Sequence, residues 1–159
     1  MADFRNSLNG KNLIVALILD DQYYALHISA VERAVRAVEI THLPDAPDIV
    51  VGVVNVQGRI IPVLNIRKRF HLPERKMKLG DQLVIANTSR RPVALIVDAV
   101  TGVLEISQQT IVRAQDVLPE IRYVDGVVKL DDGLILIHDL DKFLSLEEET
   151  DLGQALERG

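Results

Sequence analysis

The side chains of this chain that could do acid–base or metal chemistry are four histidines and a few groups of neighbouring carboxylates. The histidines are spread along the sequence, at His27, His42, His71 and His138. None of them stands in an H-x-x-x-H pair or in another ligand spacing, so the sequence predicts no metal site. His138 directly precedes Asp139 and is the most suggestive of the four, but the polar end of a strand explains this pair.

Three groups of carboxylates could pair an acid with a base. Asp20-Asp21 and Asp131-Asp132 stand where turns favour aspartate, and we expect turns there. The run Glu147-Glu148-Glu149 is most simply a solvated face. The nucleophile-elbow, phosphate-loop and dinucleotide-binding glycine motifs are missing. The sequence therefore predicts a binding module without catalytic residues, metal or cofactor. A small-ligand-binding or hydrolytic β-barrel stays open as the alternative, and it would need a polar pocket with convergent titratable groups.

Length and composition predict one domain, expected in the cytoplasm. The chain has 159 residues, and 48% of them are hydrophobic, enough for a sizeable core. It has no cysteine, which suits a reducing compartment. No apolar run approaches the ~18 residues of a membrane span, and Met1 to Arg5 lacks the apolar stretch of a secretory signal. A net charge of −5 without a basic cluster argues against nucleic acid and anionic membrane as partners.

Short apolar runs separated by turn residues predict an all-β chain, either a barrel or a sandwich. Residues 107–119 look irregular, and Ser29 to Arg33 could hold one helical turn. The expected strands are 13–19, 23–28, 35–43, 53–56, 59–64, 83–86, 93–97, 99–106, 123–130 and 134–138.

Both ends of the chain are polar. Residues 1–11 are expected to form a flexible N-terminus. Asp139 is expected to cap a final helix in which Leu140 and Leu144 lie one turn apart. The charged tail 147–159 is expected to begin as a helix and then to fray.

The stretch 43–70 predicts a proline-framed hairpin closed by a short helix. Gln57-Gly58 separates two β-branched runs at the spacing of a two-residue turn, and Gly58 can supply the positive φ that such a turn needs. Pro62 cannot donate to a ladder, so its strand is expected at a sheet edge or at a bulge. Asn65 is expected to cap the helix.

A weak internal echo indicates two similar units. Gly126-Val127-Val128 mirrors Gly52-Val53-Val54 at an offset of about 74 residues, and the strands that follow end in Asn65 or Asp139 before a short helix. One supersecondary unit used twice would give two barrels. Chance similarity between two hydrophobic hairpins is the alternative.

The same stretch resembles the signature of the CheW-like domain family, the coupling module of bacterial chemotaxis. The resemblance extends from about Leu13 to about Leu144. Gln57 stands where the family usually has arginine, and Asn65 where it usually has aspartate. The matching positions are Leu43, Pro44, Pro47, Gly52, Asn55, Val56, Gly58, Pro62, Val63, Ile66 and Arg67.

The resemblance implies a fold and a function. The fold would be two small five-stranded SH3-like β-barrels packed on a shared hydrophobic core, with short helices and a C-terminal helix, in one domain over 12–146. The function would be that of a non-catalytic cytoplasmic adaptor that couples the cytoplasmic tips of chemoreceptors to the regulatory domain of a CheA-type histidine kinase. It would be monomeric alone and recruited to membrane receptor arrays. A related adaptor in a sensory pathway unconnected with swimming stays open.

The resemblance also implies two binding surfaces. A receptor groove would use Val31, Val100 and Val103, with Gly52 nearby. The alternative is that these valines are ordinary core residues and that the glycine allows close packing. A polar surface facing the kinase would comprise Arg33, Asn55, Gln57 and Gly58.

Two departures from the family pattern alter the charge of that polar surface. The family commonly has glutamate where Arg33 stands and arginine where Gln57 stands. We expect the two side chains to be neighbours across the barrel surface, with an Arg–Gln hydrogen bond in place of an ion pair. The main consequence would be for the choice of partner, because interface charges set specificity more than affinity.

Overall fold

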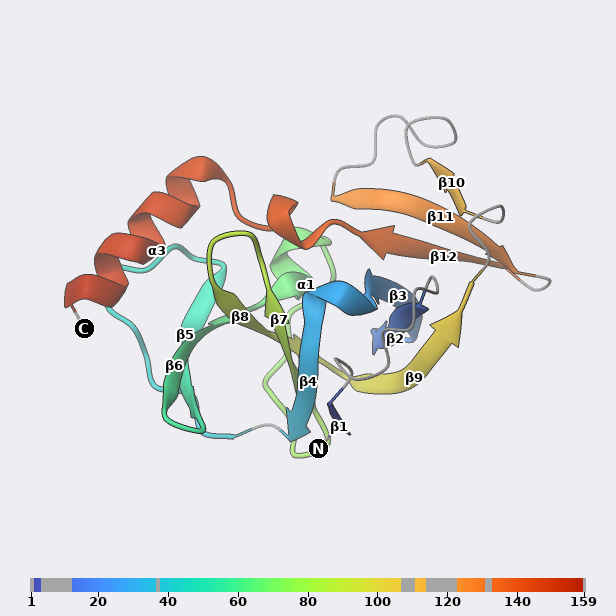
Figure 1. Cartoon of the computed structure of the whole chain (residues 1–159). Coiled ribbons are helices and arrows are strands. Elements are labelled where there is room, and N and C mark those ends of the chain that lie inside the picture. The colour runs from blue at the N-terminus through green and yellow to red at the C-terminus, as the bar shows by residue number, and fades with distance from the viewer. Residues whose placement is uncertain are drawn as a thin grey trace.

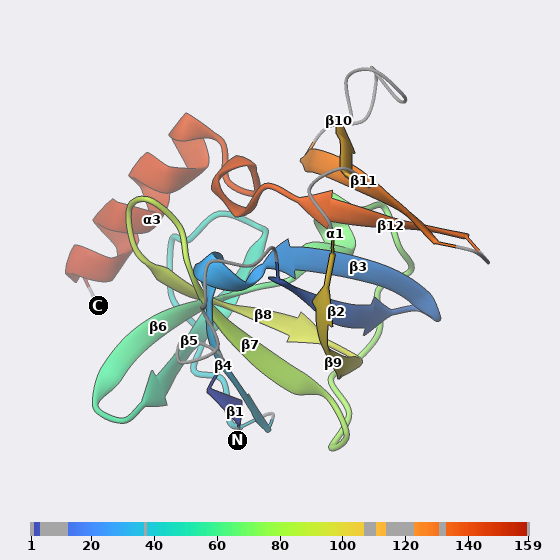
Figure 2. The same cartoon turned by 45° about the vertical axis from the view of Figure 1, so that its right-hand side comes forward.

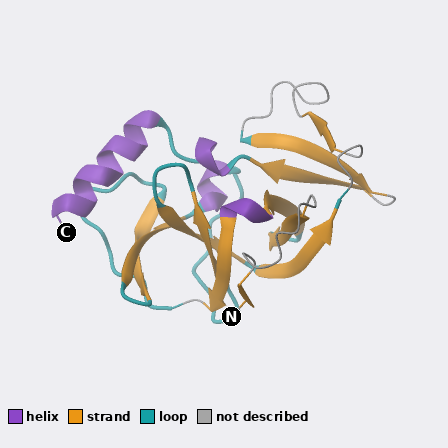
Figure 3. Cartoon of the chain, viewed as in Figure 1, coloured by secondary structure: helices purple, strands orange, loops and turns teal. Residues whose placement is uncertain are grey.

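Strands dominate the computed structural model, which describes residues 2–3, 13–36, 38–106, 111–113, 123–130 and 133–158 (Figure 3). The helical elements are short, apart from the last: η2 (Ile28–Ala30), α1 (Ile66–Arg69), η4 (Leu140–Lys142) and α3 (Leu146–Arg158). The strands in chain order are β1 (Ala2–Asp3), β2 (Leu13–Leu19), β3 (Gln22–His27), β4 (Val31–Arg36), β5 (Val50–Val56), β6 (Arg59–Leu64), β7 (Gln82–Asn87), β8 (Pro92–Val97), β9 (Ala99–Glu105), β10 (Ile111–Arg113), β11 (Val124–Leu130) and β12 (Gly133–His138).

The first sheet closes on itself. Its order is β1-β4-β7-β8-β6-β5, and the pair β6–β8 is parallel while the others are antiparallel. The chain that follows β4 returns to β5 at the other edge. There the Thr41 amide donates to the Val53 carbonyl (2.9 Å), and the Val53 amide donates to the Thr41 carbonyl (2.8 Å). This bridge joins the two edges into a small barrel.

The second sheet has the order β10-β11-β12-β3-β2-β9, with β12–β3 as its parallel pair. The two sheets lie side by side, with α3 against the first and β10 to β12 on the far side of the second (Figures 1 and 2). β1 and β10 are edge strands of two and three residues, so each sheet consists of the five predicted strands and one short addition. The prediction of two SH3-like barrels is confirmed, except that each sheet has six strands instead of five.

The internal echo is a structural repeat. Val50 pairs with Leu64 and Gly52 with Val63 across one bulge, and Val124 pairs with His138 and Gly126 with Ile137 across another. The caps repeat as well. Asn65 accepts the Arg67 amide at 3.1 Å, and Asp139 accepts the Asp141 amide at the same distance. Chance similarity does not account for matching registers, bulges and caps at one offset.

The buried apolar side chains of the described residues fall into four groups. Because side chains alternate between the two faces of a strand, β2 contributes to two of these groups. Ile14 faces the interior of the second barrel, whereas Val15, Leu17 and Leu19 join the core shared by both barrels. The interior of the first barrel consists of Val54, Val56, Ile61, Val63, Leu83, Ile85 and Ala94.

The hairpin at Gln57-Gly58 has the predicted form. Gln57 has φ of 52° and Gly58 has φ of 84°, so both turn residues are left-handed, as a type I′ turn requires. Asn55 supports the turn because its side-chain oxygen accepts the Gly58 amide at 2.9 Å. Asp20 and Asp21, with φ of 54° and 63°, form the predicted turn between β2 and β3.

The prediction for Pro62 was wrong, since β6 lies between β5 and β8 and its bulge with β5 is at Val50/Gly52. Val53, opposite Pro62, directs its amide and carbonyl to Thr41, away from β6. The missing N–H of Pro62 therefore faces β8, and the ladder with β8 begins one residue later, at Val63. A proline fits an interior strand here because no ladder bond is lost.

Several boundaries differ from the prediction. β5 begins at Val50, three residues earlier than expected. Asp139 caps only the 3-10 turn η4, so Leu144 lies outside that turn, and the tail expected to fray is the helix α3 as far as Arg158.

The strand expected over 35–43 is β4, which starts at Val31, and the helical turn precedes it as η2. The reason is β7, which pairs with β4 from Val31 to Arg36 and supplies bonds that the local sequence does not reveal. Asp131-Asp132 and most of the stretch expected to be irregular lie outside the described residues, as does most of 1–11.

The C-terminal helix packs on the shared core. Leu152 and Ala155 of α3 are buried there. Two arginines hold its first turn. Arg69 donates to both oxygens of Glu148 at 2.8 Å, and the Nε of Arg91 donates to Glu149 at 2.5 Å. The glutamate run is therefore more than a solvated face, because opposite charges 58 or more positions away in sequence bind it.

Candidate functional site

The valines of the predicted receptor groove differ in exposure. Val31 is 1% exposed and belongs to the shared core. Val100 is half-buried and packs against that core. Val103 is 36% exposed, and Leu104 beside it is exposed to a similar degree. Of the three valines, Val103 thus offers apolar surface to a partner, and for Val31 the core alternative is the one that fits.

Gly52 serves the closure of the first barrel. A Cβ built on Gly52 would lie 2.2 Å from the carbonyl oxygen of Thr41 and 2.8 Å from the Cγ2 of Ile40. The glycine is buried under the segment that bridges to β5. The close-packing alternative therefore explains this glycine without reference to a partner.

Three of the four residues of the predicted polar surface lie at the exposed tip of the β5–β6 hairpin, and the fourth, Arg33, is half-buried on β4. Asn55, Gln57 and Gly58 are all exposed there, and Ile60 next to them is an exposed apolar residue. The tip is well fixed because the turn is left-handed at two positions and tied to Asn55. It offers a partner a small rigid surface with amide and apolar groups.

The ion pair across this surface is formed by Glu32 and Arg59, which the sequence analysis missed. A bulge in β4 between Val31 and Arg33 makes Glu32 the extra residue of the strand. Glu32 is 2% exposed, and both terminal nitrogens of Arg59 donate to its carboxylate. The pair lies one residue from Arg33 and two from Gln57. The expected Arg33–Gln57 hydrogen bond stays a prediction.

A second set of charges joins the two barrels. Arg67 of α1 is buried, and its guanidinium donates to Asp98 (2.7 Å), to the Pro73 carbonyl (2.9 Å) and to Asp20 (3.4 Å). Asp98 lies between β8 and β9, where the chain passes from the first sheet to the second, and it also accepts the Asp20 amide at 2.8 Å. Burial acts to raise the pKa of Asp98, but the Asp20 amide and the neighbouring guanidinium groups lower it below its ordinary value. The arginine of the family-like motif thus holds the barrels together.

The histidines do not converge on a reactive site. The Nε2 of His27 is 2.9 Å from an oxygen of Asp125 in an exposed pair. His138 is buried, and its ring lies 4.6 Å from that of Phe70 and 5.2 Å from that of Tyr24, measured between ring centroids. Within the described residues, no group of three or more His, Asp or Glu could hold a metal ion.

The acid sensitivity of the fold should depend on His138. Burial lowers its pKa to about 4, although the nearby Tyr123 carbonyl opposes the shift. Unfolded, the ring titrates near 6.5, so the unfolded chain binds more protons between these two values. Above pH ~6.5 His138 is neutral in both states and does not lower the free energy of unfolding. As the pH falls from ~6.5 to ~4, protonation of this ring in the unfolded chain lowers the free energy of unfolding by about 3 kcal/mol in total. We expect His138→Leu to lose less stability than wild type between pH 7.5 and 4.5.

Urea denaturation at both pH values measures this effect. His42→Gln is the matched control, because it removes an exposed histidine instead of the buried one. Equal pH dependence of His138→Leu and wild type would contradict the assignment.

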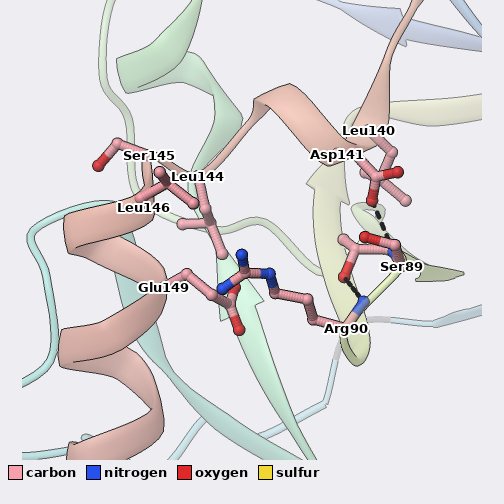
Figure 4. A pocket seen from close by; sticks show the side chains of 9 residues that line it. Ser89, Arg90, Leu140, Asp141, Leu144, Ser145, Leu146 and Glu149 are labelled. Atoms are coloured by element: carbon pink, nitrogen blue, oxygen red, sulfur yellow. Dashed lines mark hydrogen bonds between the residues drawn. The ribbon is translucent and has the colours of Figure 1, made fainter.

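Polar pockets in the described part of the chain are small. One of about 160 Å³ lies between the β7–β8 turn and the start of α3, where the Ser89 amide donates to Asp141 at 2.6 Å (Figure 4). Another of about 180 Å³ includes His27, Asp125 and His138. Ligand sites usually measure about 300 to 1,000 Å³. A hollow of about 440 Å³ reaches that size, but Tyr23 is the one titratable side chain among the residues that line it, so it lacks the convergent titratable groups that the alternative needs. These pockets lend no support to the ligand-binding or hydrolytic alternative.

Comparisons with known proteins agree with this architecture. The family model of the CheW-like domain matches residues 14–148. The chain is 30% identical to a chemotaxis protein CheW from Treponema pallidum, covering 85% of this chain and 83% of that protein. It is 33% identical to a chemotaxis protein CheW from Thermotoga maritima, covering 82% and 86%.

A solved structure gives the same result. The crystal structure of the scaffolding protein TtCheW from Thermoanaerobacter tengcongensis superposes with a TM-score of 0.78 at 31% identity, covering 87% of this chain and 95% of that one. The matched region of the family model takes in both barrels and the Arg67 network between them. The chain therefore belongs to the CheW-like domain family.

Proposed function

We propose that this protein is a non-catalytic adaptor that couples chemoreceptors to a CheA-type histidine kinase. The observation that carries the proposal is the family match over residues 14–148. The relatives bear the name chemotaxis protein CheW, and the similar solved structure is titled a scaffolding protein. The described pockets and histidines, which offer no assembled reactive site, are in keeping with a role in binding.

An adaptor needs separate surfaces for its two partners, and the fold offers them. Val103 lies on β9 in the second sheet, and the Asn55–Gly58 tip lies on the β5–β6 hairpin of the first. The Arg67 network fixes one barrel against the other. Receptor contact at β9 and kinase contact at the hairpin tip could therefore exist together, with their relative position set by the barrels.

The adaptor is expected to act in the cytoplasm, as a monomer that receptor arrays recruit. In the part of the chain that the structure describes, no helix has the length and apolar character to cross a membrane. Recruitment would thus depend on the receptor surface.

Reconstitution tests the proposed function. The purified protein is combined with the kinase and with a cytoplasmic receptor fragment, and kinase autophosphorylation is measured. We expect the receptor fragment to change kinase activity only when this protein is present. The same activity with and without the protein would refute the coupling role.

The groove assignment predicts that Val103→Asp weakens receptor binding and spares the fold. Val103 is partly exposed, so the unfolding temperature should change little. A carboxylate that the docking receptor fragment must desolvate should raise the Kd for that fragment about tenfold or more. Calorimetric titration and thermal unfolding measure the two quantities.

Val31→Asp is the contrasting variant. It would force a charge into the shared core and should unfold the protein. Unchanged receptor affinity of a folded Val103→Asp variant would count against β9 as the receptor surface.

A further inference from the structure

The loop 72–81 between α1 and β7 is held by Arg75, which forms ion pairs with Asp81 and with Asp98. Arg75 donates to both carboxylate oxygens of Asp81, at 2.9 and 2.7 Å. Asp81 is buried, and it also accepts the Lys78 amide at 2.8 Å, while its own amide donates to the Lys78 carbonyl at 3.0 Å. These bonds close the segment 75–81 into a fixed loop, so its tip has a defined position.

The tip of this loop presents Leu79 to solvent. Leu79 is 99% exposed, and Met77 is partly exposed on the same loop. A side chain that buries nothing does not stabilise the fold, so the pinning of the loop does not serve the packing of Leu79. An apolar residue held in advance in one position loses little entropy on binding, which is the usual property of an anchor at an interface.

Lys76 and Lys78 flank the apolar residues and are both exposed. Asp81 and Asp98 balance the charge of Arg75, whereas neither lysine forms an ion pair within the described residues. The tip is therefore a local positive site on a chain with a net charge of −5. Its complement is an apolar position bordered by carboxylates.

The loop ends beside the strand that carries the proposed receptor surface. Gln82 follows it directly, and the side-chain oxygen of Gln82 accepts the amide of Val100 at 2.7 Å. Val100 is the second residue of β9 and lies three residues before the exposed Val103. A receptor tip bound along β9 from Val103 toward Val100 would therefore reach the end of this loop.

We propose that Leu79 is an apolar anchor for the cytoplasmic tip of the receptor, in addition to β9, and that Lys76 and Lys78 select a tip with carboxylates around its apolar contact. This inference rests on the proposed coupling function and identifies a part of the receptor site that the sequence analysis did not include.

Two variants test the anchor. Leu79→Ser should weaken binding to the purified cytoplasmic receptor fragment about tenfold, because the apolar burial of one leucine is lost. Its unfolding temperature should equal that of wild type. Leu146→Ser is the matched control, since Leu146 is also largely exposed (73%) but lies at the start of α3, and its affinity should be unchanged. The double variant Lys76→Glu/Lys78→Glu should weaken binding further at low salt than at high salt.

The outcomes separate the anchor from the coupling function. If wild type binds the receptor fragment and Leu79→Ser binds equally well, the anchor is refuted and the coupling function stands. If wild type does not bind the fragment, the receptor side of the coupling function fails and the anchor fails with it. Loss of affinity for the kinase alone, or for phosphatidylglycerol vesicles alone, would also refute the receptor as the occupant.

Discussion

Replacing Arg67 with methionine is expected to lower the free energy of unfolding by about 2 to 4 kcal/mol. Arg67 is buried, and its guanidinium bonds to Asp98 and to Asp20 of the second barrel's turn. Without Arg67, Asp98 would keep its bonds from Arg75 and from the Asp20 amide but would lose the bond from the Arg67 guanidinium. The Pro73 carbonyl would also lose its donor. The lost bonds are charge-assisted and therefore stronger than neutral ones, but Asp98 and Asp20 stay partly solvated (25% and 43% exposed), so the cost is smaller than for a fully buried ion pair.

Urea denaturation at pH 7 measures this loss, with Lys68→Met as the control. Lys68 is next in sequence, but it is exposed and makes a surface ion pair of 3.7 Å with Glu74. We expect the control to change stability by no more than about 0.5 kcal/mol. A loss below about 1 kcal/mol for Arg67→Met would mean that the network does not hold the barrels together.

Gly52→Ala should open the first barrel and cost about 3 kcal/mol or more. The new Cβ would overlap the Thr41 carbonyl oxygen at 2.2 Å, and no rotamer relieves a contact between Cβ and backbone. The segment around Thr41 would have to move away, which breaks both hydrogen bonds of the bridge to Val53. Hydrogen exchange of the Val53 amide should accelerate together with the fall in the denaturation midpoint.

Gly80→Ala provides the control for this variant. No atom lies within 4 Å of a Cβ built on Gly80, and the change should stay within about 0.5 kcal/mol of wild type. A folded Gly52→Ala protein of wild-type stability that fails to bind receptor would instead favour the groove assignment of this glycine.

These two variants concern how the protein could transmit a signal. Gly52 closes one barrel, and Arg67 joins that barrel to the other. An adaptor with partners on both barrels works as one body only if both connections hold. Under the proposed function, a variant that weakens the Arg67 network and remains folded should bind each partner separately and couple them less well.

Local sequence was sufficient for the hairpins and caps. Gln57-Gly58 forms the predicted turn because glycine readily takes positive φ, and Asn65 caps α1 because its short side chain reaches the Arg67 amide. The repeat at about 74 residues was also visible, since Gly126 and Gly52 recur with the same apolar neighbours. Resemblance to the family signature added the two-barrel architecture that these local signals do not specify.

The sequence did not indicate which valine faces solvent. Val31 and Val103 are the same residue type in two strands, yet one is in the shared core and the other is exposed. Exposure depends on which strand lies opposite, and β4 is covered by packing between the barrels whereas β9 forms the edge of its sheet among the described residues.

The sequence by itself determined the all-β class, the turns, the helix caps and the absence of linear catalytic motifs, because each of these depends on residues close together in the chain. Only the tertiary structure decided the roles of Glu32, Arg67 and Gly52. Their partners are Arg59, Asp98 and Thr41, which come from other strands or loops. A contact across a closed barrel depends on register and closure, and no spacing along the chain encodes it.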